Sequence, residues 1–127
     1  MWLSIDEKDS RPLYLQIVNQ IKEQVSRGTL KPGDELPSVR ELGDSLKINL
    51  HTVRSAYLKL REEGIIDLRL GRRAKIARME RFSPKTESLD RLEQKAKELV
   101  TDARLLGLSE EGIRGLIDRQ LREKGRT

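Results

Sequence analysis

Apolar residues recur at helical spacing in the first part of the chain. A proline precedes this stripe and a glycine follows it, and these residues, Pro12 and Gly28, stand where each is typical of a helix boundary. The spacing predicts an amphipathic helix whose buried face carries Leu13, Ile17, Val18, Ile21 and Val25. We expect a short extended segment around Leu3 and Ile5 before it.

Two shorter helices are predicted next, with a break of three residues between them. The run SVRE at residues 38–41 fits a capping box, in which the serine hydroxyl accepts the glutamate N–H and the carboxylate reaches back. Residues 47–49 interrupt this second helix. Asn49 is a suitable N-cap for the third helix, whose buried face is expected to carry Val53, Ala56, Tyr57 and Leu60.

The apolar period changes from helical to alternating after the third helix. Apolar side chains alternate with polar ones at Ile66, Leu68 and Leu70, which predicts a half-buried strand. A turn and a return strand are expected over residues 71–77. Three helices followed by a hairpin describe a winged helix-turn-helix, which we place at residues 1–77.

A different unit follows the hairpin. Residues 78–88 are polar and are expected to form a linker, and residues 89–127 carry one-sided apolar stripes that break at Gly107. Two short helices of this kind bury too little apolar surface to be stable alone, so they need a partner surface. A second copy of the chain is the simplest partner, and the alternative is that the stripe covers the first domain.

The expected fold class is therefore mainly α with a small β-hairpin wing: a winged helix-turn-helix plus a two-helix C-terminal dimerisation tail. The near-heptad spacing of the tail favours dimerisation over an internal cover. The residues expected at the dimer interface are Leu89, Leu92, Ala96, Leu99, Ala103, Leu106, Ile113, Leu116, Ile117 and Leu121.

Composition narrows the chemistry that the chain can perform. It has no cysteine and a single histidine, His51, which exclude disulfides, thiolate catalysis and a histidine metal cluster. No nucleophile with a base and no phosphate-cradling loop is recognisable, so we expect neither an enzyme nor a metal or other cofactor. The net charge of +5 is compatible with nucleic acid. Because no apolar run approaches membrane-spanning length and no signal peptide is apparent, we expect a cytoplasmic protein without membrane contact.

Several runs of residues in register carry a resemblance to a known family. Residues 12–17 read PLYLQI, residues 28–42 read GTLKPGDELPSVREL, residues 52–60 read TVRSAYLKL and residues 63–66 read EGII. Together they closely resemble the signature of the GntR family of bacterial repressors, and the two short tail helices look most like its YtrA-type subfamily. The resemblance implies a dimeric, DNA-binding repressor, often of transporter operons.

The sequence departs from the family pattern in two places. Where the family usually has Ser-Arg-Asn before Thr-Val, this chain has Asn49-Leu50-His51, so the arginine that commonly reads a base is replaced by leucine. Where the wing usually has Gly-x-Gly-Thr, residues 71–74 read GRRA and keep only the first glycine. Two arginines at the wing tip suit a narrow, negative minor groove.

Candidate DNA-contacting residues follow from the same elements. Side chains at the N-terminal end of a recognition helix reach base edges in the major groove, where Arg54 is suited to guanine and Leu50 to a thymine methyl. The alternative is that Asn49 is only a cap and His51 only a solvated residue. The candidate set is Ser38, Arg40, Asn49, Leu50, His51, Thr52, Arg54, Gly71, Arg72 and Arg73.

Arg40 is placed in the first turn of the second helix, where a positive charge opposes the helix dipole. A nearby anion explains that position, and DNA would supply one; the alternative is a surface ion pair with Glu41 or Asp44. For Arg72 and Arg73 the alternative is a solvated hairpin tip.

The sequence favours a sequence-specific dimeric regulator, acting as a repressor on an inverted-repeat operator in double-stranded DNA. The alternative is a winged-helix architectural or protein-interaction module that binds DNA without reading its sequence. Selection of duplexes from a random pool discriminates the two. The sequence identifies no small-molecule effector.

Overall fold

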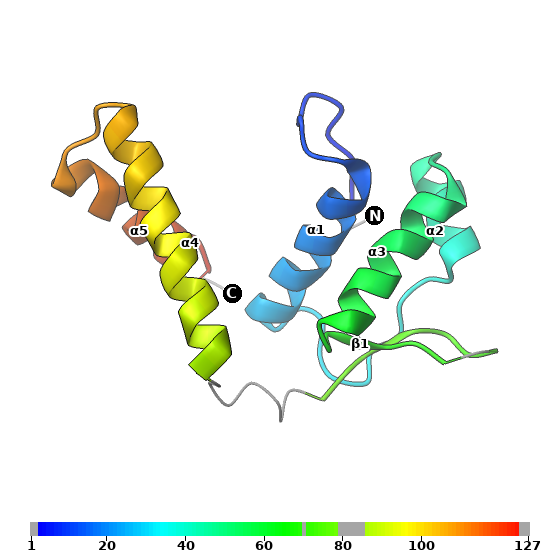
Figure 1. Cartoon of the computed structure of the whole chain (residues 1–127). Helices are drawn as coiled ribbons and strands as arrows, with labels where there is room; N and C mark the ends of the chain where they lie inside the picture. Colours follow the sequence, from blue (N-terminus) through cyan, green and yellow to red (C-terminus); the bar gives the residue numbers. More distant parts are fainter. Residues whose placement is uncertain (1–2, 70, 79–85, 125–127) are drawn as a thin grey trace. The chain divides into compact units, whose positions relative to one another are not determined.

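The computed structural model describes residues 3–69, 71–78 and 86–124. The chain divides into two compact units, Met1–Met79 and Glu80–Thr127, which we call the first unit and the tail unit. Apart from one two-stranded antiparallel sheet, the regular structure of the described residues is helical, which confirms the expected fold class (Figure 1). The elements are α1 Leu13–Arg27, α2 Val39–Leu46, α3 Leu50–Glu62, β1 Ile66–Asp67, β2 Lys75–Ile76, α4 Thr86–Leu105 and α5 Glu110–Lys124.

Helix α3 is the centre of the first unit, because both α1 and α2 pack against it (Figure 1). All four predicted core residues of α3 are buried. The predicted stripe of α1 is buried in its middle, whereas Leu13 in the first turn is exposed and Val25 in the last is half-buried. The buried side chains that the helices share include Ile17, Ile21, Leu42, Val53, Tyr57 and Leu60.

The predicted caps of the helix-turn-helix are present. The Ser38 hydroxyl accepts the N–H of Glu41 at 3.1 Å, and the Glu41 carboxylate accepts the N–H of Ser38 at 2.9 Å. The side chain of Asn49 accepts the N–H of His51 at 2.7 Å. Gly43 lies within α2, and a Cβ on it would lie 3.3 Å from the carbonyl oxygen of Ile48 in the turn before α3, so a residue without a side chain permits this tight turn.

The hydrogen-bonded strands of the wing, residues 66–76, are shorter than the alternating sequence pattern predicts. Its two strands pair Ile66 with Ile76 and Asp67 with Lys75. Leu68 lies half-buried beyond the ladder, and Leu70 lies outside the described residues. Further support comes from the loop before α2, which meets β2 through a bridge at Glu35 and backbone hydrogen bonds at residues 33–36.

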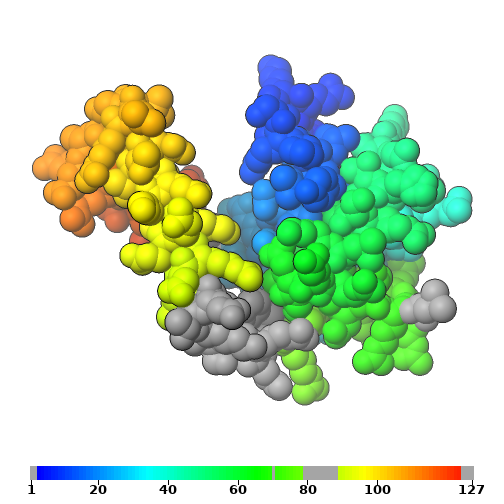
Figure 2. Space-filling model, viewed as in Figure 1, coloured from blue at the N-terminus to red at the C-terminus, as the bar shows by residue number. Residues whose placement is uncertain are grey.

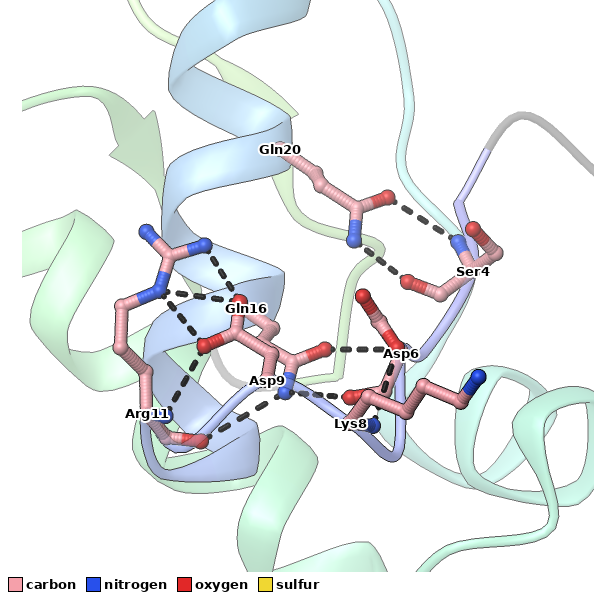
Figure 3. Close-up of polar contacts among 7 residues, drawn as sticks. All are labelled: Ser4, Asp6, Lys8, Asp9, Arg11, Gln16 and Gln20. Atoms are coloured by element: carbon pink, nitrogen blue, oxygen red, sulfur yellow. Dashed lines mark hydrogen bonds and ion pairs between the residues drawn. The ribbon is translucent and has the colours of Figure 1, made fainter.

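The N-terminal segment is held on α1 by two glutamine side chains rather than by a strand (Figure 3). The Gln16 amide accepts the N–H of Asp6 at 2.9 Å and donates to its carbonyl oxygen at 3.1 Å. Gln20 makes the same pair of bonds to Ser4. The side-chain amides thus replace the backbone partner that an extended segment needs, and Leu3 is inserted into the core.

In the tail unit, α4 begins at Thr86 and therefore inside residues 78–88, which the sequence assigned to a linker. A serine hydroxyl caps α5, since Ser109 accepts the N–H of Gly112 at 3.1 Å. The predicted stripe residue Leu106 lies beyond the end of α4, in the turn before α5. Of the hydrophobic residues described in this unit, only Ala103 is buried.

Candidate nucleic-acid interface

The predicted contact residues come from three elements, the starts of α2 and α3 and the wing, which internal bonds link to one another. The start of α2 and the start of α3 are linked through their turn, where the N–H of Ile48 donates to the carbonyl oxygen of Gly43 at 3.0 Å. The start of α2 and the wing are linked by an ion pair between Glu41 and Arg73. In Figure 1 the wing projects past the helices on the side where α2 lies.

The first turns of α3 present a polar face away from the core. His51, Arg54 and Ser55 are exposed, while Leu50 and Thr52 are half-buried. Within the part of the chain that the structure describes, the side chains of His51 and Arg54 have no hydrogen-bond or ion-pair partner. The N-terminal part of this helix therefore offers a cation, an imidazole and hydroxyls to an external ligand.

A groove between α3 and α1 lies next to the candidate contact residues of α3, and it was not identified from the sequence. His51, Thr52 and Ser55 line one side of it, and Leu13 and Tyr14 at the start of α1 line the other. The sequence carried no signal for this groove, because its periodicity assigned Leu13 to the buried face of the helix and the exposure of that side chain is seen only in the structure. The groove brings the start of α1 beside the candidate contact residues of α3.

Arg40 stands exposed in the first turn of α2. Neither ion pair considered for it, with Glu41 or with Asp44, is formed. Among the described residues its guanidinium has no partner, so a positive charge remains at the positive end of the helix dipole. A bound anion would offset this unfavourable placement.

The two arginines of the wing differ in their surroundings. The Arg72 side chain is exposed and has no partner among the residues that the structure describes. Arg73 instead pairs with Glu41: Nη1 lies 2.6 Å from Oε1 and Nη2 donates to Oε2 at 3.0 Å. This contact was not anticipated from the sequence, which placed both arginines together at a DNA-facing tip.

Glu41 is the most strongly perturbed carboxylate on this surface. Its pKa is lowered from an ordinary 4.5 to about 2. The largest cause is the hydrogen bond from the Arg73 side chain, and the second is the hydrogen bond from the N–H of Ser38. The carboxylate is therefore ionised at neutral pH, and both the cap and the ion pair are in place.

Tyr57 fixes the start of α2 from inside the core. Its hydroxyl donates to the carbonyl oxygen of Pro37 at 2.6 Å, directly before the N-cap Ser38. Burial, with a smaller contribution from the charge of Glu41, raises the pKa of the Tyr57 hydroxyl, so it remains a hydrogen-bond donor. The sequence placed this tyrosine on the buried face of its helix but gave no partner for its hydroxyl.

Other kinds of site find no support among the described residues. No group of three or more His, Cys, Asp or Glu side chains is arranged to hold a metal ion there. No helix in that part of the chain combines the length and the apolar character needed to cross a bilayer.

Comparison with known proteins gives consistent matches. The profile of the bacterial regulatory proteins of the gntR family matches residues 13–76. The HTH-type transcriptional repressor YtrA of Bacillus subtilis (strain 168) is 38% identical over 111 residues, which cover 87% of this chain and 85% of that protein. Because 111 residues exceed the length of the first unit, this similarity extends into the tail unit.

Two solved structures are similar over nearly the whole chain. One, from Listeria monocytogenes EGD-e and described as a transcriptional antiterminator, is 32% identical with a TM-score of 0.87, covering 95% of this chain and 90% of the other. The other, YtrA from Sulfolobus acidocaldarius, described as a GntR-family transcription factor, is 34% identical with a TM-score of 0.58, covering 94% and 97%. The resemblance drawn from the sequence is thus confirmed: the chain belongs to the GntR family of bacterial regulatory proteins and to its YtrA-type subfamily.

Proposed function

We propose that two copies of this chain bind an inverted-repeat operator in double-stranded DNA and repress transcription in the cytoplasm. The observation that carries the proposal is a set of exposed arginines, on α2, on α3 and in the wing, that have no side-chain partner among the described residues. Arg40, Arg54 and Arg72 come from three different elements, which an ion pair and backbone hydrogen bonds link to one another. The repressor YtrA, which is similar over most of the chain, supports the same direction of regulation.

The start of α3 is proposed to enter the major groove. Its side chains Leu50, His51, Thr52 and Arg54 precede or lie outside the buried face of the helix, so they are available to base edges. With leucine at position 50, sequence reading relies on Arg54 for a guanine and on Leu50 for a thymine methyl group.

The remaining cations are proposed to contact the sugar-phosphate backbone and the minor groove. Arg40 at the start of α2 is positioned for a phosphate, and Arg72 for the minor groove next to the recognition site. Ser38 and Asn49 already use their side chains as caps, so their contribution to DNA binding is to place the helix starts.

The tail unit is proposed to form the dimer interface. Large apolar side chains on α4, on α5 and in the turn between them remain exposed in the single chain, to 61% for Leu92, 65% for Leu121 and 80% for Leu106 respectively. On the face shown in Figure 2, α4 (yellow) is not covered by α5. Residues 89–127 carry these stripes, and a second copy would bury them across a two-fold axis.

Selection of DNA from a pool of random duplexes by the full-length chain tests the proposal. We expect enrichment of a motif with two-fold symmetry, whose half-sites lie about one helical turn apart. Binding to that motif should weaken steeply as salt rises, because phosphate contacts release counterions. A pool that remains unenriched would contradict sequence reading and favour an architectural or protein-interaction role.

A further inference from the structure

The wing of this protein is tied to α2 through one carboxylate. Glu41 Oε1 accepts the N–H of Ser38 at 2.9 Å and lies 2.6 Å from Nη1 of Arg73, and Oε2 accepts Nη2 at 3.0 Å. The same side chain therefore completes the cap of α2 and receives a two-pronged contact from the wing. Two-pronged pairs between arginine and carboxylate fix direction as well as distance.

Beyond its short ladder, the wing is attached to the first unit by Leu68 and Ala74, which pack against the core. The ladder consists of two residue pairs, and the loop before α2 supports the β2 side only. Within the described part of the turn, the N–H of Arg72 donates to the carbonyl oxygen of Arg69. Among the described residues, the contact between Arg73 and Glu41 is the side-chain ion pair that joins the turn to the start of α2.

We propose that Arg73 is a positioning residue, which holds the wing against the start of α2 so that Arg72 is the wing cation that reaches DNA. This inference rests on the proposed function. Arg73 stands where the family wing has its second glycine, so the pair with Glu41 replaces a flexible residue by a fixed contact. Because the Arg73 guanidinium is occupied by a carboxylate, a phosphate would have to displace that carboxylate to bind it.

Substitution of Glu41 distinguishes two possible roles of Arg73, positioning the wing or contacting DNA itself. The two roles predict changes in DNA affinity of opposite sign. Glu41→Gln retains the capping box, because glutamine also serves at the third helical position, but removes the charge that holds Arg73. If Arg73 positions the wing, this variant binds DNA more weakly. If Arg73 is itself a DNA contact, the variant frees it and removes a negative charge beside the DNA, so binding becomes tighter.

The test measures binding of a duplex recovered from the random pool by fluorescence anisotropy over a range of salt concentrations. We expect Glu41→Gln and Arg73→Gln each to weaken binding about two- to fivefold, the range open to an exposed ion pair, and the double variant to lose no more than either single one. The salt dependence of Arg73→Gln should equal that of the wild type. The matched control, Arg72→Gln, should lower the slope by about one, because it removes one cation that releases a counterion when it contacts DNA.

A second measurement does not depend on DNA. An NMR titration should show the Glu41 carboxyl with a pKa near 2 in the wild type, rising toward its ordinary value in Arg73→Gln and unchanged in Arg72→Gln. An ordinary value in the wild type would overturn the proposed pair, whatever the protein does with DNA. Conversely, failure of the pool to yield a duplex would count against the proposed function while leaving this titration valid. Tighter or unchanged DNA binding by Glu41→Gln would also overturn the positioning role.

Discussion

At the scale of single residues, the arginines of the first unit fall into two groups. Arg73 is engaged by a carboxylate, whereas Arg40, Arg54 and Arg72 are exposed and lack side-chain partners in the part of the chain described. An exposed arginine loses little by standing alone in water, so its lack of a partner is informative only through its position. Here the three positions are the two helix starts and the wing turn, which together form the proposed DNA surface.

Arg54→Ala should weaken binding to the selected duplex and relax the base preference at one position of each half-site. Loss of one good base pairing costs about 1–3 kcal/mol of discrimination. Arg61→Ala is the matched control, because Arg61 is exposed in the last turn of the same helix, away from the proposed contacts. Equal losses from both variants would argue against the major-groove placement of the start of α3.

Tyr57→Phe should destabilise the first unit by about 1 kcal/mol, since it removes the hydroxyl that bonds to the carbonyl oxygen of Pro37. Urea unfolding measures this change. Tyr14→Phe is the comparison, because Tyr14 is half-buried and its hydroxyl has no bond within the described residues. A cost as large for Tyr14 would mean that the bond to Pro37 contributes nothing particular.

At the scale of elements, α2 depends on contacts at its start as well as on its buried face. The capping box, the tyrosine from α3 and the arginine from the wing all meet within residues 37–41. A helix of eight residues has a small buried face, so bonds at its end account for a larger share of its stability. The start of α2 is thus the point through which α3 and the wing are connected.

The contribution of Glu41 to the stability of the folded chain should depend on pH. Its pKa is lowered in the folded chain, so the contribution is present above the ordinary value of 4.5 and is lost as the pH falls from there through about 2. The difference in urea midpoint between the wild type and Arg73→Gln should therefore be present at neutral pH and close at about pH 2. A difference that persists at that pH would show that Arg73 acts on stability by another route.

At the scale of the whole molecule, the two units differ in how much of its own apolar surface each one buries. The first unit has a closed core to which the N-terminal segment, three helices and the wing contribute. The tail unit has helices with apolar stripes and, among its described hydrophobic residues, one that is buried. A unit of this kind gains stability by association, which is the basis of the proposed dimer.

Leu92→Gln should shift the chain toward the monomer and weaken binding to the symmetric duplex more than to a single half-site, because coupled binding of two copies is lost. Glutamine is nearly as good a helix former as leucine, so α4 itself should persist. Lys95→Gln is the control on the same helix. Sedimentation velocity gives the oligomeric state, and a wild-type chain that is monomeric at micromolar concentration would rule out the proposed interface.

The sequence alone determined the elements of this fold and most of their ends. Gly28, the run at residues 38–41 and Asn49 mark helix boundaries through bonds to neighbours a few residues away, so their signals are complete in the local sequence. The wing was located correctly, but its ladder was overestimated, since alternation continues through Leu68 after the hydrogen-bonded pairs end.

The tertiary structure decided which polar groups meet. Arg73 and Glu41 are 32 positions apart, Tyr57 and Pro37 are 20, and Gln20 and Ser4 are 16. No periodicity or cap spans such distances, because each contact depends on how whole elements pack rather than on the residues beside it. For that reason the sequence could name both wing arginines as candidates. Only the packed structure shows that one of them is held by α2, whereas the other has no side-chain partner among the residues described.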